Sequence, residues 1–388
     1  MRTIGFVVMI CASILIFGGV NYYIGLRSWQ GIGGFIPFIS NKVYWIIFWG
    51  IALSFIIARV GSKFLPLRVE ALLSLLGSYW MAAILYLLIL LPSIDIIRFA
   101  MKRTRFIASG IRDSTFIKNY FGIIIFIFLI GILVYGTWNA KSIKVAQYNI
   151  DIQGKSSNIE ELKIVMISDL HLGNIVNNSR LLTMVEKIND LHPDIVLIAG
   201  DIIDDSIKPF IRQNMGETFK KLKTKYGVFA ATGNHDYYGG DVEELINNLE
   251  SSGVNVLTDK YIEINDSFVV VGREDIAVES YYKRDRKKVS DILSDDNKKL
   301  PIILIDHTPK NLQEPMENGV DLQVSGHTHR GQMFPSRYIT ERLFEVDWGY
   351  LKKDNLNVVV SSGIGTWGPP IRIGNSSEIV EINLRFIK

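Results

Sequence analysis

The sequence predicts a group of N-terminal transmembrane α-helices followed by an α/β domain, and three observations support this fold class. Four apolar stretches dominate the chain up to residue 140. Beyond it, short β-branched runs alternate with helical stretches, which is typical of a layered α/β fold. The histidines gather in this second part, beside Asp, Asn and Gly. We therefore predict a membrane domain with four transmembrane helices at residues 1–140 and a globular domain at residues 146–388.

The four apolar stretches contain no charged residue. Three of them are long enough to cross a bilayer, which needs about 20 apolar residues. The second reaches the interfaces only if its flanking cations extend toward them. A cleaved signal peptide is the alternative for the first stretch, but no small-residue cleavage site stands out and three further stretches follow. The stretches lie between Arg2 and Arg27, Lys42 and Arg59, Glu70 and Asp95, and Lys118 and Lys141.

The loop after the third stretch is the most basic segment of the membrane domain, and it includes Lys102, Arg103 and Arg105. The four apolar stretches together predict an integral, multi-pass protein of the cell or inner membrane. Because basic loops stay preferentially in the cytoplasm, the loop after the third stretch is expected to be cytoplasmic. The globular domain would then be extracytoplasmic. The single cysteine, Cys11, lies within a predicted span, so no disulfide in the globular domain reports the compartment.

Short apolar runs bounded by turn residues predict the buried strands of the globular domain. An alternating first strand is expected at residues 146–152, after a linker at 139–145. Helical periodicity predicts helices at 181–190 and 242–250. Five further strands each precede a turn that carries an Asp, Asn or His, and they are expected at 163–168, 195–199, 228–232, 302–305 and 322–325.

Five of the six histidines belong to one ordered series of motifs that follows these five strands. Loops after strand ends gather catalytic groups in sheet-based folds, so five converging loops predict a multi-ligand metal site. Carboxylate, imidazole and amide oxygen suit Mn, Fe or Zn, and a shared carboxylate can hold two ions about 3.5–4 Å apart. The series reads Asp169-Leu-His171, Gly200-Asp201, Gly233-Asn234-His235-Asp236, His307 and Gly326-His327-Thr328-His329.

The ordered series resembles that of the calcineurin-like metallophosphoesterases, and the resemblance covers the chain from Ile150 to the C-terminus. Residues 169–173, 326–332 and 363–374, together with the apolar stretches, resemble its membrane-associated bacterial branch. Relatives in that branch include phosphodiesterases and UDP-diacylglucosamine hydrolases. The resemblance implies a layered sandwich of two mixed β-sheets flanked by helices. It also implies a hydrolase in which a hydroxide bridging two divalent metal ions per chain, most simply Mn, attacks phosphorus.

The family pattern implies a role for each matching residue. Asp201 would bridge the two metals. His235 would face the phosphate and stabilise or protonate the leaving oxygen, oriented by Asp236. The remaining ligands would be Asp169, His171 and His329 for the first metal, and Asn234, His307 and His327 for the second.

Other polar residues have less certain roles. Arg330 stands where this branch often has glycine, and it either clamps a phosphate oxygen or lies on the rim of the site. Arg372, near the C-terminal family motif, is a second candidate for substrate binding. The basic run 283–288 is either a solvated surface segment or a contact with anionic lipid or substrate. Asp204 and Asp205 are expected to be solvated or capping residues rather than metal ligands, and His192 is expected to end a helix before a strand. Trp348 and Trp367 are expected to pack rather than to form a substrate platform.

The leading hypothesis is a membrane-anchored phosphodiesterase that hydrolyses a phosphodiester or pyrophosphate of a lipid or envelope-linked substrate. A phosphomonoesterase is the nearest alternative, and a catalytically inactive metal-binding membrane module is another. The intact Asn234, His235 and Asp236 argue against inactivity, and the nearly uncharged spans offer no ion pathway. The net charge of only +3 and the membrane location speak against nucleic acid. The expected partner is the lipid bilayer, and no specific protein partner is indicated.

Overall fold

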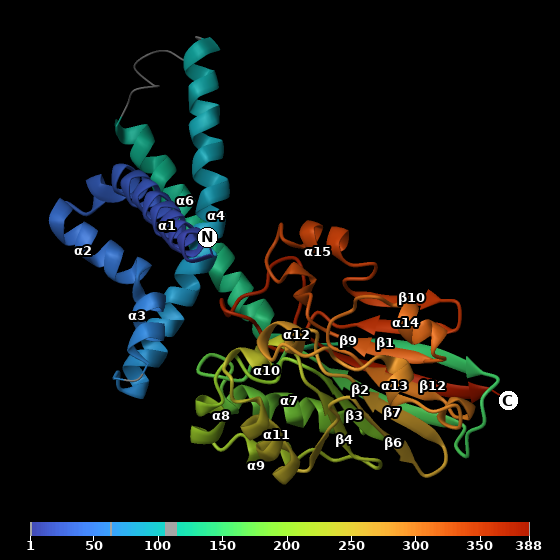
Figure 1. Cartoon of the computed structure of the whole chain (residues 1–388). Helices are drawn as coiled ribbons and strands as arrows, with labels where there is room; N and C mark the ends of the chain where they lie inside the picture. Colours follow the sequence, from blue (N-terminus) through green and yellow to red (C-terminus); the bar gives the residue numbers. More distant parts are fainter. Residues whose placement is uncertain (1, 63, 105–114, 388) are drawn as a thin grey trace. The chain divides into compact units, whose positions relative to one another are not determined.

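The computed structural model describes residues 2–62, 64–104 and 115–387. The chain divides into two compact units, Met1–Gly136 and Thr137–Lys388, which we call the N-terminal unit and the globular unit. The first consists of helices and the second contains all the strands that the described residues form (Figure 1).

The N-terminal unit contains apolar helices of membrane-spanning length. Among its described residues, three helices are long and apolar enough to cross a membrane, Val7–Phe35, Arg68–Ala100 and Tyr120–Lys141. A fourth candidate is a pair of shorter helices, Asn41–Ala52 and Ser54–Gly61, bent by 51°. The elements are α1 (Arg2–Ile32), the 3-10 turn η1 (Gly33–Phe35), α2 (Asn41–Ala52), α3 (Ser54–Gly61), α4 (Leu67–Thr104) and α6 (Thr115–Lys141).

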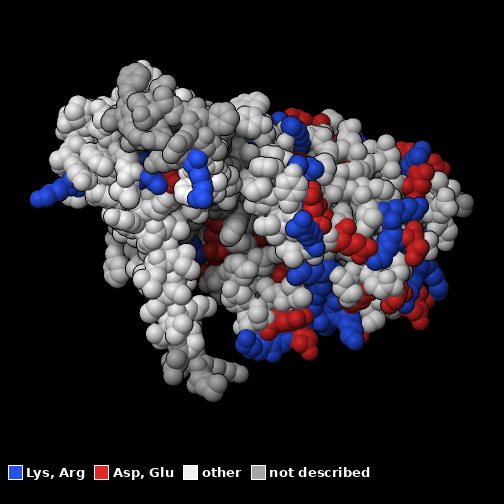
Figure 2. All heavy atoms as spheres, turned by 90° about the horizontal axis from the view of Figure 1, so that it is seen from above, with Lys and Arg blue, Asp and Glu red and all other residues white. Residues whose placement is uncertain are grey.

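Charged side chains are few on the N-terminal unit and frequent on the globular unit, where both signs are interspersed (Figure 2). This distribution fits association of the apolar helices with a membrane. Of the basic loop that we predict to be cytoplasmic, residues 105–114 lie outside the described residues.

The first sheet of the globular unit has the strand order β1-β12-β2-β3-β4-β5. Its strands β2, β3, β4 and β5 run parallel, whereas β12 is antiparallel to β2, so the sheet is mixed. The strands are β1 (Lys144–Gln153), β2 (Glu161–Ile167), β3 (Ile195–Ala199), β4 (Val228–Ala231), β5 (Val254–Val256) and β12 (Glu378–Ile387).

The second sheet has the strand order β10-β11-β9-β8-β7-β6. The inner strands β11, β9, β8 and β7 are parallel, and the edge strands β10 and β6 pair antiparallel to them. The strands are β6 (Lys260–Ile264), β7 (Phe268–Gly272), β8 (Ile302–Ile305), β9 (Leu322–Ser325), β10 (Gly349–Lys353) and β11 (Leu356–Val360).

The two sheets pack face to face, and helices cover their outer faces (Figure 1). Phe229 of the first sheet and Phe268 of the second belong to the apolar cluster between the sheets. Such a shared core stabilises the sandwich because each sheet buries one apolar face against the other. The longer helices are α7 (Asn178–Asp190), α11 (Val242–Ser251) and α15 (Arg337–Leu343), and short ones are α8 (Lys208–Arg212), α9 (Gly216–Phe219), α10 (Asn234–Tyr238), α12 (Ala277–Tyr281), α13 (Val289–Ile292) and α14 (Gln313–Glu317).

This architecture confirms the predicted fold class of apolar helices followed by an α/β sandwich of two mixed sheets. The predicted strands at 195–199, 302–305 and 322–325 coincide with β3, β8 and β9. All three are buried along their whole length. Continuous apolar runs of this kind are typical of strands that are covered on both faces.

The predicted linker at 139–145 is instead part of two ordered elements. Helix α6 extends to residue 141, and only residues 142–143 separate it from β1. The Asn139 side chain, in the last turn of α6, donates hydrogen bonds to the backbone carbonyls of Arg372 (3.0 Å) and Asn375 (2.6 Å). The last turn of this helix therefore belongs structurally to the globular unit.

Candidate metal centre

Each sequence-predicted ligand segment follows the carboxyl end of a strand. The strands β2, β3 and β4 are parallel neighbours in the first sheet, and β8 and β9 are parallel neighbours in the second. Because both sheets send their loops to the same end, side chains from five strands can meet there. The segments begin at Asp169 after β2, Asp201 after β3, Asn234 after β4, His307 after β8 and His327 after β9.

The backbone of the ligand loops is strained. Five of the seven predicted metal ligands have a positive φ, a conformation that non-glycine residues adopt at a cost of about 1–3 kcal/mol each. Such strain concentrates at functional sites, where the surrounding structure enforces it. Gly200 also has a positive φ of 77°, and a Cβ added there would lie 2.6 Å from His307 Nδ1. The five ligands are Asp169, His171, Asp201, His327 and His329.

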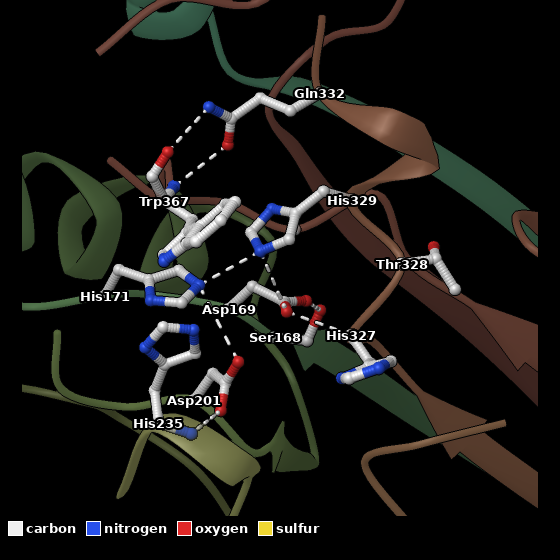
Figure 3. A network of polar contacts seen from close by, with 12 residues as sticks. Ser168, Asp169, His171, Asp201, His235, His327, Thr328, His329, Gln332 and Trp367 are labelled. Carbon is white, nitrogen blue, oxygen red and sulfur yellow. Dashed lines mark hydrogen bonds and ion pairs between the residues drawn. The ribbon is translucent and has the colours of Figure 1, made fainter. Parts of the chain in front are cut away.

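A first group of ligand atoms converges on one point (Figure 3). The Nε2 atoms of His171 and His329 face each other at 3.0 Å. His329 Nε2 lies 3.4 Å from Asp169 Oδ1, and His171 Nε2 lies 3.7 Å from Asp201 Oδ2. All four residues are buried, and one ligand atom from each lies within 4.8 Å of the others.

A second group shares Asp201 with the first. Asn234 Oδ1 lies 2.8 Å from His327 Nδ1 and 3.2 Å from His307 Nε2. His307 Nε2 is in turn 3.2 Å from Asp201 Oδ2. The His307 Nδ1–H donates to the Ala199 carbonyl at 2.7 Å. A carbonyl can only accept, so this bond leaves the Nε2 lone pair free for a metal.

The protonation tendencies of two of the ligand histidines suit metal binding. Burial lowers the pKa of His171 and of His329 well below the ordinary value, and for His329 the nearby Arg372 charge acts in the same direction. Neutral imidazole is the form that ligates metals. Among the described residues, His171 Nδ1 is a buried nitrogen without a hydrogen-bond partner. The two groups of nitrogen and oxygen donors, joined through Asp201 Oδ2, therefore fit a pair of divalent ions.

Comparison with known proteins agrees with this geometry. The family model described as calcineurin-like phosphoesterase matches residues 162–331. An uncharacterised metallophosphoesterase from Aquifex aeolicus is 31% identical over 246 residues, which cover 63% of this chain and 92% of the relative. The chain belongs to the calcineurin-like metallophosphoesterase family. The centre described above is therefore the dinuclear divalent metal site of a metal-dependent phosphoester hydrolase.

Relatives of this metallophosphoesterase include proteins whose names describe them as transmembrane. A zebrafish (Danio rerio) transmembrane protein with metallophosphoesterase domain is 29% identical over 323 residues, covering 80% of this chain and 72% of the relative. That match is longer than the globular unit, so it extends into the N-terminal unit. An uncharacterised metallophosphoesterase from Helicobacter pylori is 32% identical over 231 residues, covering 58% of this chain and 60% of the relative. The apolar helices and the first of these relatives support membrane association.

His235 of the metallophosphoesterase lies beside the first group of ligands, and its ring packs edge-on against that of His171 with centroids 4.7 Å apart. Its backbone N–H donates to Asp201 Oδ1 at 2.8 Å. Its ring Nδ1 lies 2.7 Å from Asp205 Oδ1. Burial opposes the charged imidazolium, but the Asp205 hydrogen bond and the Asp201 charge together raise the pKa of His235 above its ordinary value.

The partner of His235 differs from the sequence expectation. Asp236 was expected to orient the ring, but its carboxylate accepts the backbone N–H groups of Ile202 (2.9 Å), Ile203 (3.0 Å) and Gly233 (2.8 Å). Asp236 therefore ties two ligand loops together. Asp205, expected to be a solvated or capping residue, is the carboxylate that contacts the ring. Only the tertiary contact between residues 30 positions apart reveals this.

Arg372 is also placed differently from the expectation of substrate binding. Its side chain is fully buried, with 0% exposed. Its guanidinium donates to the carbonyls of Gly363 (3.1 Å) and Gly365 (2.8 Å) and lies 3.4 Å from His329 Nδ1. Burial lowers the pKa of Arg372 to about 10. Because it lies behind a metal ligand and has no open face, Arg372 can position His329 but cannot reach a substrate.

Arg330 stacks on Trp348, with its guanidinium carbon 3.7 Å from the ring centroid. The Trp348 Nε1–H donates to the Glu378 carboxylate at 3.0 Å. This contact holds Arg330 at the periphery in the conformation described. Whether Arg330 binds substrate stays a prediction from the sequence.

In the basic run 283–288, Arg284 pairs with Glu274 (2.6 Å) and Arg286 with Asp306 (2.9 Å), so these two residues have structural partners.

Aromatic rings surround His235. The Tyr238 ring lies 4.7 Å and the Trp367 ring 5.9 Å from the His235 ring, measured between centroids. Tyr281 packs on Tyr238 at 5.2 Å. Trp367 is 54% exposed, although its backbone N–H is held by Gln332 (2.9 Å; Figure 3). Trp367 therefore is not a core residue, and it presents a half-exposed ring beside the metal centre.

Asp205→Asn separates the roles of the two carboxylates near His235. We expect turnover to fall by about 10–100-fold, the usual effect of removing a carboxylate that orients a site histidine. Metal content and the melting temperature should stay unchanged. Asp236→Asn should instead lower the free energy of unfolding by about 1–3 kcal/mol, since both carboxylate oxygens accept backbone N–H groups and the amide nitrogen that replaces one of them cannot accept. Calorimetry and steady-state kinetics on both variants check this, and a loss of bound metal in Asp205→Asn would contradict it.

Proposed function

We propose that the protein is a membrane-anchored phosphodiesterase, with a phosphodiester or pyrophosphate of a lipid or envelope-linked molecule as its substrate. When bound, two divalent ions supply an activated water and neutralise charge on the phosphoryl oxygens. Asp169, His171 and His329 would hold one ion, and Asn234, His307 and His327 the other, with Asp201 shared. His235 would donate a proton or hydrogen bond to the leaving oxygen, held in orientation by Asp205.

The observation that carries the preference for a diester is the negative charge beside His235. Asp205 contacts the His235 ring at 2.7 Å, and Asp204 Oδ1 lies 3.9 Å from His171 Nδ1. The Asp204 carboxylate is 31% exposed, so its charge reaches the entrance of the site. A phosphomonoester carries a second negative charge near neutral pH, and these carboxylates would repel it. A diester carries a single charge and is repelled less.

The aromatic rings suit a substrate with a bulky leaving group. Trp367 and Tyr238 flank His235, the residue proposed to face the leaving oxygen. Exposed rings at this position offer apolar surface to a bulky leaving group. Nitrogen and oxygen donors without any thiolate also favour Mn as the physiological metal, with Fe or Zn as alternatives.

The proposal is tested with purified full-length protein loaded with Mn. We expect kcat/KM for bis(p-nitrophenyl) phosphate to exceed that for p-nitrophenyl phosphate by roughly tenfold, because about 1.4 kcal/mol of repulsion corresponds to that factor. Asp204→Asn removes one of the repelling charges and should bring the kcat/KM values for the two esters closer together. Equal or better hydrolysis of the monoester would favour a phosphomonoesterase, and no hydrolysis of any ester would favour an inactive module.

The natural substrate and the side of the membrane need separate measurements. A panel of phospholipids, lipid pyrophosphates and nucleotide-linked lipids, with products detected by mass, would identify the substrate class. We propose that the globular unit faces outward, on the basis of the basic third loop. Phosphatase reporters fused after Lys118 and after Lys144 test this. Activity after Lys118 and silence after Lys144 would reverse the topology, and would direct the search to nucleotide-activated lipid precursors.

A further inference from the structure

Helix α15 presents apolar side chains to the outside of the globular unit. Among the described residues from Thr137 onward, three large apolar side chains are more than 60% exposed: Leu343 (69%), Trp138 (63%) and Ile339 (61%). Two of the three lie on α15, spaced four residues apart and thus on one helix face. The third lies near the end of α6. Soluble surfaces rarely concentrate such residues, and a cluster of them marks an interaction site.

The surroundings of α15 have the composition of an interfacial helix. Phe334 and Tyr338 are also exposed, at 42% and 47%. The guanidinium of Arg337 lies over the ring of Tyr338 at 4.9 Å, and Arg342 adds a second cation in the last turn. Exposed aliphatic side chains beside aromatic rings and arginines are typical of helices that lie in the plane of a bilayer surface.

The chain directly after α15 contacts a predicted metal ligand. Thr340 Oγ1 donates to Asp347 Oδ2 at 2.7 Å. Phe344, directly after the helix, packs against the ring of His327 with centroids 5.8 Å apart. No residue of α15 itself is buried, so the helix lies on the surface, and the residue that follows it packs on a metal ligand.

The chain around α15 is connected to the residues at which the last apolar helix ends. The backbone N–H of Phe334 donates to the Ile373 carbonyl at 2.8 Å. The adjacent Arg372 carbonyl accepts from the Asn139 side chain in the last turn of α6. The Ala140 carbonyl in the same turn accepts from Ser377 Oγ at 2.8 Å. The apolar window of α6 runs to Lys141. The segment that carries α15 is therefore linked, through residues 372 and 373, to the last turn of the predicted span.

We propose that α15 is a membrane-docking element, whose outer face of Phe334, Tyr338, Ile339 and Leu343 inserts into the headgroup layer of the bilayer that the N-terminal helices enter. The exposed side chains would lie about 5–10 Å deep, at the boundary of headgroups and acyl chains. Arg337 and Arg342 would remain at the phosphate level, where their cations meet lipid phosphates. Docking would fix the entrance next to His327 at the level of lipid headgroups.

Depth-dependent fluorescence quenching tests this on the full-length chain in liposomes. Cys11 is the single cysteine, so a Cys11→Ser background allows one environment-sensitive label at Ile339→Cys and, independently, at Leu343→Cys. The matched control is Ile262→Cys on β6, at the opposite edge of the second sheet from β10. Ile262 is 36% exposed. Lipids that carry a nitroxide near the headgroup should remove most of the fluorescence at positions 339 and 343 and leave the control unchanged.

Aqueous iodide should give the reverse pattern, with strong quenching of the control only. Iodide quenching at 339 and 343 would show that the face is in water and would overturn the proposal. Protection from both iodide and lipid nitroxide would mean that a second copy or another protein covers α15, which would also overturn it. None of these readouts requires hydrolysis, so the docking proposal can fail or stand independently of the proposed phosphodiesterase activity.

Discussion

Asp201→Asn is expected to lower bound metal from close to two ions per chain and to reduce turnover by about 1,000-fold or more, since each metal contributes several kcal/mol of charge stabilisation. The reason is the shared position of the carboxylate. Asp201 Oδ2 lies 3.7 Å from His171 Nε2 in the first group and 3.2 Å from His307 Nε2 in the second. Asparagine keeps the volume but removes the charge that both ions would share.

Elemental analysis of protein loaded with excess Mn measures this directly. His171→Ala provides the comparison, because it removes a donor from the first group only and should leave close to one ion. Asp295→Asn is the control, since that carboxylate is 98% exposed and should have no effect. Two ions retained in Asp201→Asn, or one ion at most in the wild-type protein, would contradict a shared carboxylate.

His235→Ala is expected to keep the metal content and to lower turnover by about 100–10,000-fold, the usual range for loss of an acid–base group. The family pattern does not place His235 among the metal ligands, although one of its ring nitrogens lies within 4.8 Å of a ring nitrogen of His171. Its Nδ1 is paired with Asp205. The loss should be smallest for nitrophenolate esters, because a good leaving group needs little protonation.

His192→Ala is the matched control for this variant. His192 is the one histidine outside the motif series, and it is exposed after α7, so its removal should change neither kinetics nor metal content. Measurement of kcat for esters with leaving groups of increasing pKa distinguishes the possible roles of His235. An equal loss across the whole series would argue against proton donation and favour stabilisation of the charged transition state alone.

The strands that precede the candidate ligands were predictable from the sequence where their side chains are buried on both faces, as in β3, β8 and β9. The edge strand β6 was not, since four of its five residues are exposed and form no continuous apolar run. The residues that contact the ligands from behind were equally unpredictable from the sequence. Arg372 meets a histidine 43 positions away, and no local pattern in the chain signals such a contact.

The bend of α2 and α3 and the ordered end of α6 also depend on tertiary structure. Composition gives the length of an apolar stretch but not whether it is straight, and the 51° bend between α2 and α3 divides a stretch that reads as one marginal span. Likewise, the polar residues of 139–145 suggest a linker, whereas Asn139 is 5% exposed because its amide is bonded to Arg372 and Asn375.

The absence of a flexible tether between α6 and β1 affects how this enzyme meets its substrates. Only residues 142–143 separate the helix from the strand, so the metal site cannot sweep through a volume of solution as a domain on a long linker does. Under the membrane anchoring proposed above, the site would meet molecules that diffuse laterally in the same leaflet. The relevant quantity is then the number of substrate molecules per unit area. A scarce lipid phosphoester would be concentrated in the membrane plane, while a dissolved ester of equal copy number would be dilute. Diffusion in two dimensions rather than three would therefore favour lipid substrates.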